Sequence, residues 1–498
     1  MGDAVDDLSR QATVRPEGFA FRDAHGTITY EGLAQRVAGL AADLEDRPKT
    51  IGILAPNGID WVVADLACKL AAKTTVPLPP FFSPEQLIHI VRDADIQHVL
   101  CIGESMAAAA APDVPRTDIG ASGEADPGVL ATRNKADRWR RIIYTSGTTG
   151  QPKGVILASA QIESSVDALI AAVGAGSDDR YLSVLPFALL LEQICGIYVP
   201  LRVGASSYLA DGVAAACRRG LTEALVDLVD AVRPSVMVLV PGMLAGWVAA
   251  LRRTAQRAPD SLRFVAVGGA HIAPRLAAAA WRCGIPAHEG YGLTECCSVV
   301  ALNRPGERRA GTAGKPLPGL DVEIDDGEIV VTGPNVMAGY VNDVAHRGCW
   351  RTGDLGALDD EGYLTVYGRL DNVIVTSFGR NISPEWIEAM ILAEPRIERC
   401  FLIGDARPSA TAVIVASETG GAWFAKAGHA EVLALIGRLC AAAPEYARPQ
   451  EFILTDDAEL GRHGLLRRDG RPERVAIARH FASPPEAGYA RGRLMGGR

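Results

Sequence analysis

The segment Tyr144-Thr-Ser-Gly-Thr-Thr-Gly-Gln-Pro-Lys-Gly-Val155 constrains this chain more than any other part of the sequence. It follows the apolar run Ile142-Ile-Tyr144, which is typical of the end of a buried strand. Glycines let the backbone turn sharply and approach a ligand closely, while hydroxyl and backbone N–H groups and a lysine can hold phosphate oxygens. We therefore predict a polyphosphate-binding loop formed by Thr145, Ser146, Gly147, Thr148, Thr149, Gly150 and Lys153. It is not a Walker A loop, because no Gly-Lys-Ser/Thr occurs at the required spacing; the alternative is a solvated turn.

Length and composition indicate a large globular enzyme. The 498 residues exceed a single typical core, so at least two domains are expected. Apolar residues make up 48% and charged residues 22%, as in ordinary globular proteins. The net charge of −9 disfavours nucleic acid as the main partner.

The chain shows no sign of secretion or membrane insertion. Its acidic N-terminus lacks the apolar region of a signal peptide, and no apolar stretch reaches the ~18 residues of a membrane span. Ten cysteines are scattered without CxxC pairs or histidine partners, so neither zinc nor a disulfide framework is indicated. We expect a reduced, cytoplasmic protein.

Apolar runs of strand type alternate with helical patterns through the first two-thirds of the chain. Predicted strands are Thr50–Leu54, Gln97–Ile102, Arg141–Tyr144, Val236–Val240 and Phe264–Val267. Predicted helices are Trp61–Ala72 and Gln161–Val173, the second with its apolar residues on one face. This alternation predicts a layered α/β fold with largely parallel sheets.

The pattern changes after about residue 320. Val322–Val331 predicts a hairpin that turns at Asp326-Gly327, and Gly362–Tyr367 predicts another strand. A smaller α+β pattern follows Arg369. We expect an N-terminal domain of residues 1–369 and a C-terminal domain of residues 370–498, with the boundary at Gly368–Asp371.

Four more segments stand out, although each has an ordinary structural explanation when taken alone. They are His288-Glu-Gly-Tyr-Gly-Leu-Thr-Glu295, Trp350-Arg-Thr-Gly-Asp-Leu-Gly356, Tyr367–Glu388 and Gly464–Arg474. Alone, Glu295 would be a surface acid and Asp354 a turn aspartate after a glycine. Ser383-Pro-Glu385 predicts a helix start, with a hydroxyl N-cap, a proline and an acid in the first turn.

In this order and spacing, the loop and the four segments resemble the AMP-forming adenylating enzymes. That superfamily comprises acyl-CoA synthetases, peptide-synthetase adenylation domains and luciferases. The resemblance runs from Ile28-Thr-Tyr30 over nearly the whole chain. Leu185-Pro186, Leu191-Glu-Gln193 and Thr376–Asn381 look most like the long-chain fatty acyl-CoA synthetase branch.

The resemblance implies a role for each segment. Glu295 would coordinate the Mg²⁺ on ATP, Thr294 would contact the α-phosphate and Tyr291 would stack near adenine. Asp354 would accept the ribose hydroxyls with its two oxygens, and Arg369 would contact the ribose. The other positions implied for the nucleotide site are Gly268, Gly269, Ala270, Glu289, Gly290 and Gly292.

The C-terminal segment departs from the family pattern. The family usually has Asn-Gly-Lys where this chain has Asp469-Gly-Arg471. Arg471 would replace the lysine that reaches the carboxylate and the α-phosphate; the alternatives are that Arg467 or Arg468 fills this role, or that none of them does. A planar guanidinium is not equivalent to a point-like ammonium, so this departure bears on the efficiency of adenylation.

The resemblance also implies a substrate pocket. Phe187 and Leu189 lie in the segment that lines the acyl pocket, and Leu189 stands where the long-chain branch has a histidine. A leucine-rich segment is equally typical of ordinary core. His271 would flank the acyl group, or simply begin a helix. Gly379 lies in the loop that would form the thiol tunnel, and the hinge residue would be Asp371.

The expected activity has two steps. An apolar carboxylic acid, fatty or aromatic, attacks Mg·ATP to give acyl-AMP and pyrophosphate, and a thiol then displaces AMP. The expected cofactors are ATP, Mg²⁺ and coenzyme A. Leu189 and Arg471 keep two alternatives open. One is the same adenylation with a carrier protein, an amine or a small anion such as nitrite, and the other is a catalytically weak binding homologue.

Overall fold

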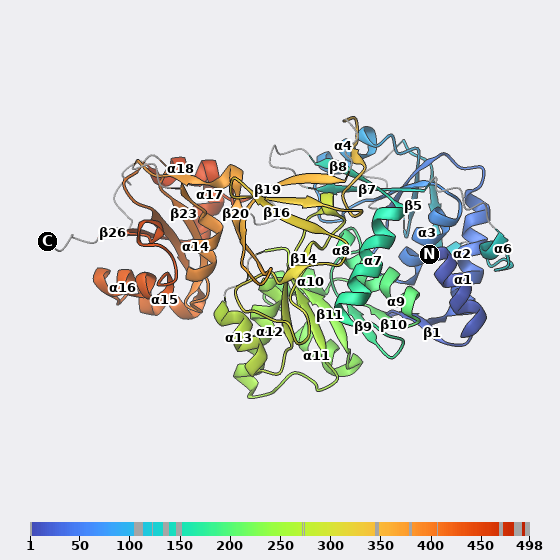
Figure 1. Cartoon of the computed structure of the whole chain (residues 1–498), viewed down its shortest axis with the longest axis horizontal. Helices are drawn as coiled ribbons and strands as arrows, with labels where there is room; N and C mark the ends of the chain where they lie inside the picture. The colour runs from blue at the N-terminus through green and yellow to red at the C-terminus, as the bar shows by residue number, and fades with distance from the viewer. Residues whose placement is uncertain are drawn as a thin grey trace.

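Figure 1 shows the computed structural model of the chain, with the C-terminal elements gathered at one end and the N-terminal helices at the other. The structure describes residues 2–103, 113–121, 123–132, 139–145, 152–270, 272, 274–343, 348–377, 381–405, 407–467, 472–482 and 491–493. Within these residues, two large sheets, a smaller antiparallel sheet and a separate C-terminal sheet make up the strands.

The first large sheet has the strand order β18-β8-β7-β4-β3-β5-β6. Its central strands run parallel, whereas β8 pairs antiparallel with β7, and β18 with β8. The predominance of buried β-branched residues in β3 suits a strand covered on both faces. The strands are β3 Thr50–Leu54, β4 Thr74–Pro77, β5 His98–Cys101, β6 Arg116–Asp118, β7 Arg140–Thr145, β8 Lys153–Ala158 and β18 Gly339–Tyr340.

The second large sheet has the order β15-β14-β13-β12-β11-β9-β10-β1-β2. The strands from β1 to β13 in this order are parallel, and antiparallel strands extend both edges. They are β1 Phe19–Arg22, β2 Thr27–Thr29, β9 Arg180–Ser183, β10 Ser206–Leu209, β11 Val236–Leu239, β12 Phe264–Val267, β13 Ala287–Tyr291, β14 Ala301–Leu302 and β15 Lys315–Pro316.

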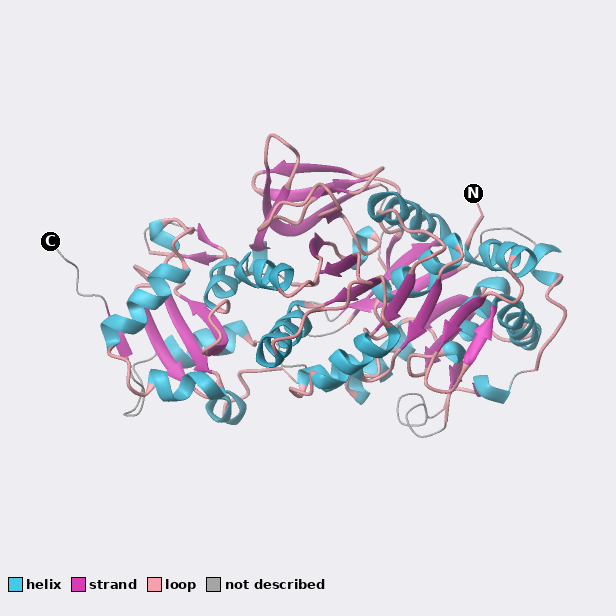
Figure 2. Ribbon diagram, turned by 90° about the horizontal axis from the view of Figure 1, so that it is seen from below, coloured by secondary structure: helices cyan, strands magenta, loops and turns pink. Residues whose placement is uncertain are grey.

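Helices cover the faces of these sheets, as Figure 2 shows from a second direction. Two large apolar clusters result, one around Trp61 and Phe187 and one around Trp247. None of the described helices combines the length and the apolar character needed to cross a membrane. The helices are α1 Ala4–Val14, α2 Tyr30–Leu44, α3 Ile59–Leu70, α4 Pro84–Asp93, α6 Val129–Thr132, α7 Ser159–Val173, α8 Leu190–Gln193, the π-helix η2 Ile194–Tyr198, α9 Val199–Val203, α10 Val213–Arg218, α11 Glu223–Val232, α12 Pro241–Thr254 and α13 Pro274–Arg282.

A four-stranded antiparallel sheet leads from these layers to the C-terminal region. Its strands are β16 Asp321–Asp325, β17 Glu328–Thr332, β19 Cys349–Leu358 and β20 Leu364–Arg369. Asp326 and Gly327 form the turn between β16 and β17, both with positive φ (50° and 82°), as the hairpin prediction requires. A short 3₁₀ turn, η4 Leu370–Asn372, follows β20 directly.

The C-terminal region has its own core. The sheet β23-β24-β25-β26 packs against helices around residues such as Ile387 and Ile436. The elements are β21 Ile374–Val375, β22 Asn381–Ile382, α14 Pro384–Ile391, β23 Ile397–Ile403, β24 Thr411–Ala416, α15 Glu418–Phe424, α16 His429–Leu439, β25 Glu451–Thr455, α17 Asp457–Arg462, α18 Arg474–Ala482 and β26 Arg491–Arg493.

The observed architecture confirms the predicted fold class, a large layered α/β part with mostly parallel sheets and a smaller α+β part. The predicted strand Phe264–Val267 has the observed bounds of β12. One local detail differs. Ser383 is the N-cap of α14 and Pro384 is its first residue, but the Ser383 side chain makes no capping hydrogen bond.

Candidate nucleotide and acyl site

The predicted phosphate loop connects two adjacent strands. Thr145 at the end of β7 pairs across the ladder with Lys153 at the start of β8. A side chain at Gly154 would come within 2.8 Å of atoms of Tyr144 and Val341, so only glycine fits beside the lysine. Predicted residues Ser146–Gly150 lie outside the described residues. The strand pairing thus fixes both ends of the β7–β8 connection.

Lys153 and Glu295 are brought together through Tyr340. Glu295 lies in the 3₁₀ turn η3 Thr294–Cys296, together with Thr294, and its Oε1 accepts a 2.8 Å hydrogen bond from the Tyr340 hydroxyl. The ammonium of Lys153 lies 5.9 Å from the centre of the Tyr340 ring. Burial and the Glu295 carboxylate together raise the pKa of Tyr340. The cation of Lys153 and the carboxylate of Glu295 therefore both lie near the side chain of Tyr340.

A second group joins three predicted nucleotide residues. The Tyr291 hydroxyl donates to Asp354 Oδ2 at 2.6 Å, and Arg369 Nη1 donates to Asp354 Oδ1 at 2.9 Å. Asp354 on β19 and Arg369 on β20 are cross-strand partners. Burial raises the pKa of Asp354, opposed by the hydrogen bond from Tyr291 and the charge of Arg369. Burial is the main cause that raises the pKa of Tyr340, and the charge of Arg369 opposes that shift.

Glycines allow close backbone approaches on the same side of the second large sheet. A side chain at Gly292 would collide with the carbonyl of Ser298, with a separation of 1.6 Å. Gly268, at the end of β12, lies against the backbone of Gly290 on the neighbouring strand. Gly269 and Ala270 continue this turn, with Gly269 at φ +82°. At Gly268 and Gly292 the missing side chain lets two backbone segments of the protein pack closely together.

Glu289 is buried beside this turn. Its Oε1 accepts a 3.2 Å hydrogen bond from Arg308, and its carbonyl accepts one from the side chain of Asn303. Burial raises the pKa of Glu289, and the Arg308 charge opposes that shift. Through these contacts Glu289 stabilises β13, the strand that ends at Tyr291.

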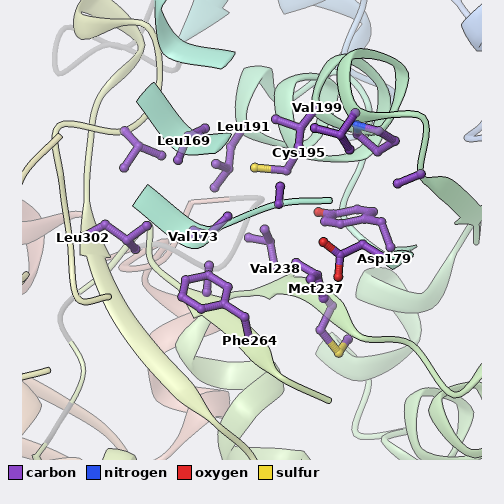
Figure 3. Close-up of a pocket in the computed structure, with 18 residues that line it drawn as sticks. Leu169, Val173, Asp179, Leu191, Cys195, Val199, Met237, Val238, Phe264 and Leu302 are labelled. Atoms are coloured by element: carbon purple, nitrogen blue, oxygen red, sulfur yellow. The ribbon is translucent and has the colours of Figure 1, made fainter. Parts of the chain in front are cut away.

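An apolar cavity of about 60 Å³ lies behind these strands. Figure 3 shows Leu191, Cys195 and Val199 on one side of it and Val238 and Phe264 on the other. The further lining residues are Leu169, Val173, Ala175, Asp179, Tyr181, Pro200, Val203, Ala205, Val236, Met237, Ala266, Val299 and Leu302. Part of the cavity wall is formed by β12, the strand that precedes Gly268. Another part is formed by Val299 and Leu302, which follow Glu295 in the sequence.

A π-helical turn, η2 Ile194–Tyr198, shapes one wall of the cavity. Single π-turns inside helices occur frequently at functional sites. Here the turn contains Cys195, and α8 and α9 on either side supply Leu191 and Val199. This wall is therefore built by an irregular helix.

Glu192 is a fully buried carboxyl in the same helical segment. The hydroxyl of Tyr181, which lines the cavity, lies 3.3 Å from both of its oxygens. Burial raises the pKa of Glu192 to about 8. The carboxyl group is therefore protonated at neutral pH. Glu192 itself is not a lining residue of the cavity; it contacts the cavity wall through Tyr181.

The remaining predicted pocket residues take different places. Phe187 is buried in the core with its ring 5.0 Å from that of Trp61, and Leu189 is 38% exposed. Neither residue lines the described cavity. Their substrate role stays a prediction. His271, Gly379 and Arg471 lie outside the described residues.

Three residues of the site had no place in the sequence predictions. Tyr340 contributes through the short edge strand β18, and no composition signal marks it. Cys195 depends on the π-turn, which a helical pattern does not reveal. Glu192 lies within the Leu191-Glu-Gln193 segment; an acid inside an apolar run is the signal that would have found it.

The matches to known protein families define a class, the nucleotide-binding ligases that activate carboxylates. The chain belongs to the AMP-binding enzyme family, which matches residues 8–341. The AMP-binding enzyme C-terminal domain matches residues 371–463. The chain is therefore an AMP-forming ligase of the acyl-CoA synthetase type.

Similar proteins include ligases for aromatic and for fatty acids. A 2-succinylbenzoate–CoA ligase of Bacillus velezensis is 30% identical over 436 residues, 80% of this chain and 85% of that protein. A long-chain-fatty-acid–CoA ligase of Mycobacterium bovis is 27% identical, covering 73% of this chain and 72% of that protein. The structure of o-succinylbenzoate CoA synthetase from Bacillus subtilis with its acyl-adenylate intermediate has a TM-score of 0.75 at 24% identity, covering 95% and 97% of the two chains.

Proposed function

We propose that this enzyme adenylates a compact apolar carboxylic acid with Mg·ATP and transfers the acyl group to coenzyme A. The observation that carries the proposal is the Asp354 carboxylate, held between Tyr291 and Arg369. Each carboxylate oxygen accepts one of these hydrogen bonds and can accept another. Two neighbouring ribose hydroxyls match this pair of acceptors.

The phosphates of ATP are assigned to the neighbouring group. Glu295 offers a carboxylate for Mg²⁺, a hard cation that proteins hold with few carboxylates and substrate phosphates. Lys153 and the β7–β8 loop supply positive charge and N–H donors, and Thr294 supplies a hydroxyl close to Glu295. Stabilising the charge on the phosphates is what adenylation requires of the protein.

The acyl group is assigned to the apolar cavity. Its free volume of about 60 Å³ is less than half of the ~150 Å³ cavity that holds a benzene molecule in an engineered protein. To admit a long acyl chain, the walls of the cavity would have to move further than they would for an aromatic or short aliphatic acid.

The second step is assigned to a movement of the C-terminal domain. We place the boundary after Arg369, with residues 370–498 as the mobile domain and Asp371 near the hinge. Arg471 would serve the first step and the segment around Gly379 the second. Hinge closure of this kind lets one site serve two reactions while excluding water from the acyl-adenylate.

The acceptor and location are also part of this proposal. Coenzyme A is preferred over a carrier protein or an amine because similar proteins are CoA ligases. A cytoplasmic location is supported by ten free cysteines, because disulfides persist in oxidising compartments.

The test is a reaction of the full-length protein with ATP, Mg²⁺, coenzyme A and a panel of aromatic and fatty acids of graded length. We expect AMP and an acyl-CoA thioester for small aromatic acids, measured by mass spectrometry, and little product from the longest acids. AMP release that requires an amine or a carrier protein instead of coenzyme A would contradict the proposed acceptor. ATP binding without AMP formation for any acid would indicate a binding homologue.

A further inference from the structure

Three potential metal ligands meet on the C-terminal region, away from the nucleotide groups. Glu459 lies on α17, His463 follows the last residue of that helix, and His480 lies on α18. One ligand atom from each lies within 4.8 Å of the other two. Nε2 of His480 is 2.9 Å and Nε2 of His463 is 3.3 Å from Oε1 of Glu459. The two imidazole rings are 4.4 Å apart.

The backbone beneath this cluster holds it in place. The Asp456 side chain caps α17 by accepting a 2.7 Å hydrogen bond from the Glu459 N–H. The His463 N–H donates to the Glu459 carbonyl at 3.2 Å, so the two side chains share one helix face. Under them, Leu460 of α17 and Ile477 of α18 belong to one hydrophobic cluster. Ligand positions on rigid elements need little ordering when an ion binds.

The two oxygens of Glu459 have separate partners. Oε1 lies between the two imidazoles, whereas Oε2 accepts a 2.9 Å hydrogen bond from Arg462. Outer hydrogen bonds of this kind orient carboxylate ligands in metal sites. The side chains of Glu459 and His480 are 13% and 24% exposed and that of His463 is 48% exposed, so an ion and a water molecule can reach the cluster.

We propose that Glu459, His463 and His480 form a binding site for a divalent transition-metal ion of the zinc class, with water as the fourth ligand. Imidazole ligands favour such ions over Mg²⁺, and two histidines with one glutamate are a known zinc ligand set. With bond lengths of ~2.0–2.2 Å, tetrahedral ligands lie about 3.3 Å apart. The observed separations are 2.9 and 3.3 Å to Oε1 and at most 4.8 Å overall, so the His480–Glu459 pair would move slightly apart and the widest pair would move closer.

A metal at this site would join α17 to α18. The two helices flank residues 463–473, the stretch of sequence that contains Arg471. The ion would restrain both ends of that stretch. The site is separate from the Mg²⁺ assigned to Glu295, and its existence does not depend on the proposed ligase activity.

The test measures metal binding directly. Full-length protein is stripped with a chelator, freed of it by gel filtration and titrated with Zn²⁺ by calorimetry and with Co²⁺ by visible absorption. We expect one high-affinity equivalent and the d–d bands of four-coordinate cobalt. His480→Gln and His463→Gln should each weaken binding at least tenfold, whereas His25→Gln, at an exposed histidine remote in sequence, should not.

Thermal unfolding provides the second measurement. Zn²⁺ should raise the Tm of the wild-type protein and of His25→Gln but not that of His480→Gln, because an ion stabilises only the state that binds it. Since His463 is half exposed, His463→Gln provides a variant in which loss of folding is not expected. The proposal would be overturned if the wild-type protein bound no equivalent of Zn²⁺ with high affinity. It would also be overturned if His480→Gln and His463→Gln both bound Zn²⁺ as tightly as the wild type.

Discussion

Asp354 is a buried carboxylate whose negative charge is held by a phenol and a guanidinium. The pKa of Asp354 rises on burial in spite of these two partners, which shows how costly the charge is at this position. A functional reason for keeping a carboxylate there is its pair of acceptor oxygens. An amide of the same shape has only one acceptor oxygen and adds donors.

The substitution Asp354→Asn tests this role. We expect kcat/KM for ATP to fall at least tenfold, a loss of about 1.4 kcal/mol of transition-state stabilisation, because one ribose hydroxyl would meet an N–H group. Pyrophosphate exchange at varied ATP concentration measures the effect. The control is Asp260→Asn, at an exposed aspartate. Equal KM values for ATP in wild type and Asp354→Asn would contradict the assignment.

Glu192 makes the stability of the protein depend on pH. Its pKa is about 8 in the folded chain and 4.5 in its ordinary state. Between these values the folded state holds a proton that the unfolded state releases, so this carboxyl lowers the stability progressively as the pH rises from about 4.5 to about 8. Each unit of pKa difference corresponds to about 1.4 kcal/mol.

Replacing Glu192 by glutamine should remove this dependence. We expect the Tm of Glu192→Gln relative to wild type to be higher near pH 8.5 than near pH 5.5, since only the wild type must bury a charge at high pH. Differential scanning fluorimetry across the pH range provides the measurement. Glu17→Gln, at an exposed glutamate, is the control. Parallel pH curves for Glu192→Gln and wild type would refute the prediction.

Single residues also show what sequence can and cannot predict. Glu295, Asp354 and Tyr291 were selected because each lies in a short segment that resembles a motif of the adenylating enzymes. Tyr340 was not, because its contact with Glu295 depends on the pairing of β18 with β8 across a separation of almost 200 residues. Contacts that arise only from tertiary pairing leave no local pattern in the chain.

At the scale of elements, the strands were easier to predict than the irregular helix. Phe264–Val267 forms a strand because its aromatic and β-branched residues suit a buried sheet. The segment Ser183–Gln193 was expected to line a pocket, and no prediction was made for the irregular helix Leu190–Val203 in which it ends. This helix contains α8, the π-turn and α9 in sequence, and a π-turn is not marked by residue type.

Cys195 lies in the π-turn and lines the cavity, so a larger side chain at this position should reduce the space inside it. Cys195→Phe should reduce kcat/KM for the acid at least tenfold and leave the KM for ATP within a factor of two, because the ring would fill the acyl space. One methylene in a pocket changes selectivity by ~10–200-fold. Steady-state kinetics with acid and ATP varied separately measures both values. Cys349→Phe, at an exposed cysteine, is the control. A rise in the KM for ATP alone would contradict this role for the turn.

At the scale of the whole molecule, the connection between the two parts is short. The ring of Tyr367 lies 5.5 Å from that of Trp386 on α14, and the Asn372 side chain donates to Glu385 at 2.6 Å. These contacts hold the present orientation on both sides of η4. The predicted boundary at Arg369 falls where β20 ends, but sequence carries no information on which orientation the parts adopt.

The substitution Asp371→Pro tests the proposed hinge. Proline fixes φ near −65°, which a 3₁₀ turn accepts, so the variant should favour the present orientation. Single-turnover kinetics measures the rate of adenylation and the rate of thioester formation separately. We expect the substitution to affect one of these rates at least tenfold more than the other. Asp360→Pro, at the second position of a surface turn closed by the Gly362 N–H and the Asp359 carbonyl, is the control. Equal effects on both rates would count against the hinge.

The ion pair between Arg369 and Asp354 has a consequence for how the molecule senses its substrate. Arg369 is the last residue of β20 and adjoins Leu370, the first residue of η4. A nucleotide that hydrogen-bonds to Asp354 would alter the ion pair between Asp354 and Arg369. Arg369 is the last residue before the proposed hinge. Linkage between two equilibria is reciprocal. If ATP binding shifts the equilibrium between orientations of the C-terminal part by a given factor, the change of orientation shifts the affinity for ATP by the same factor.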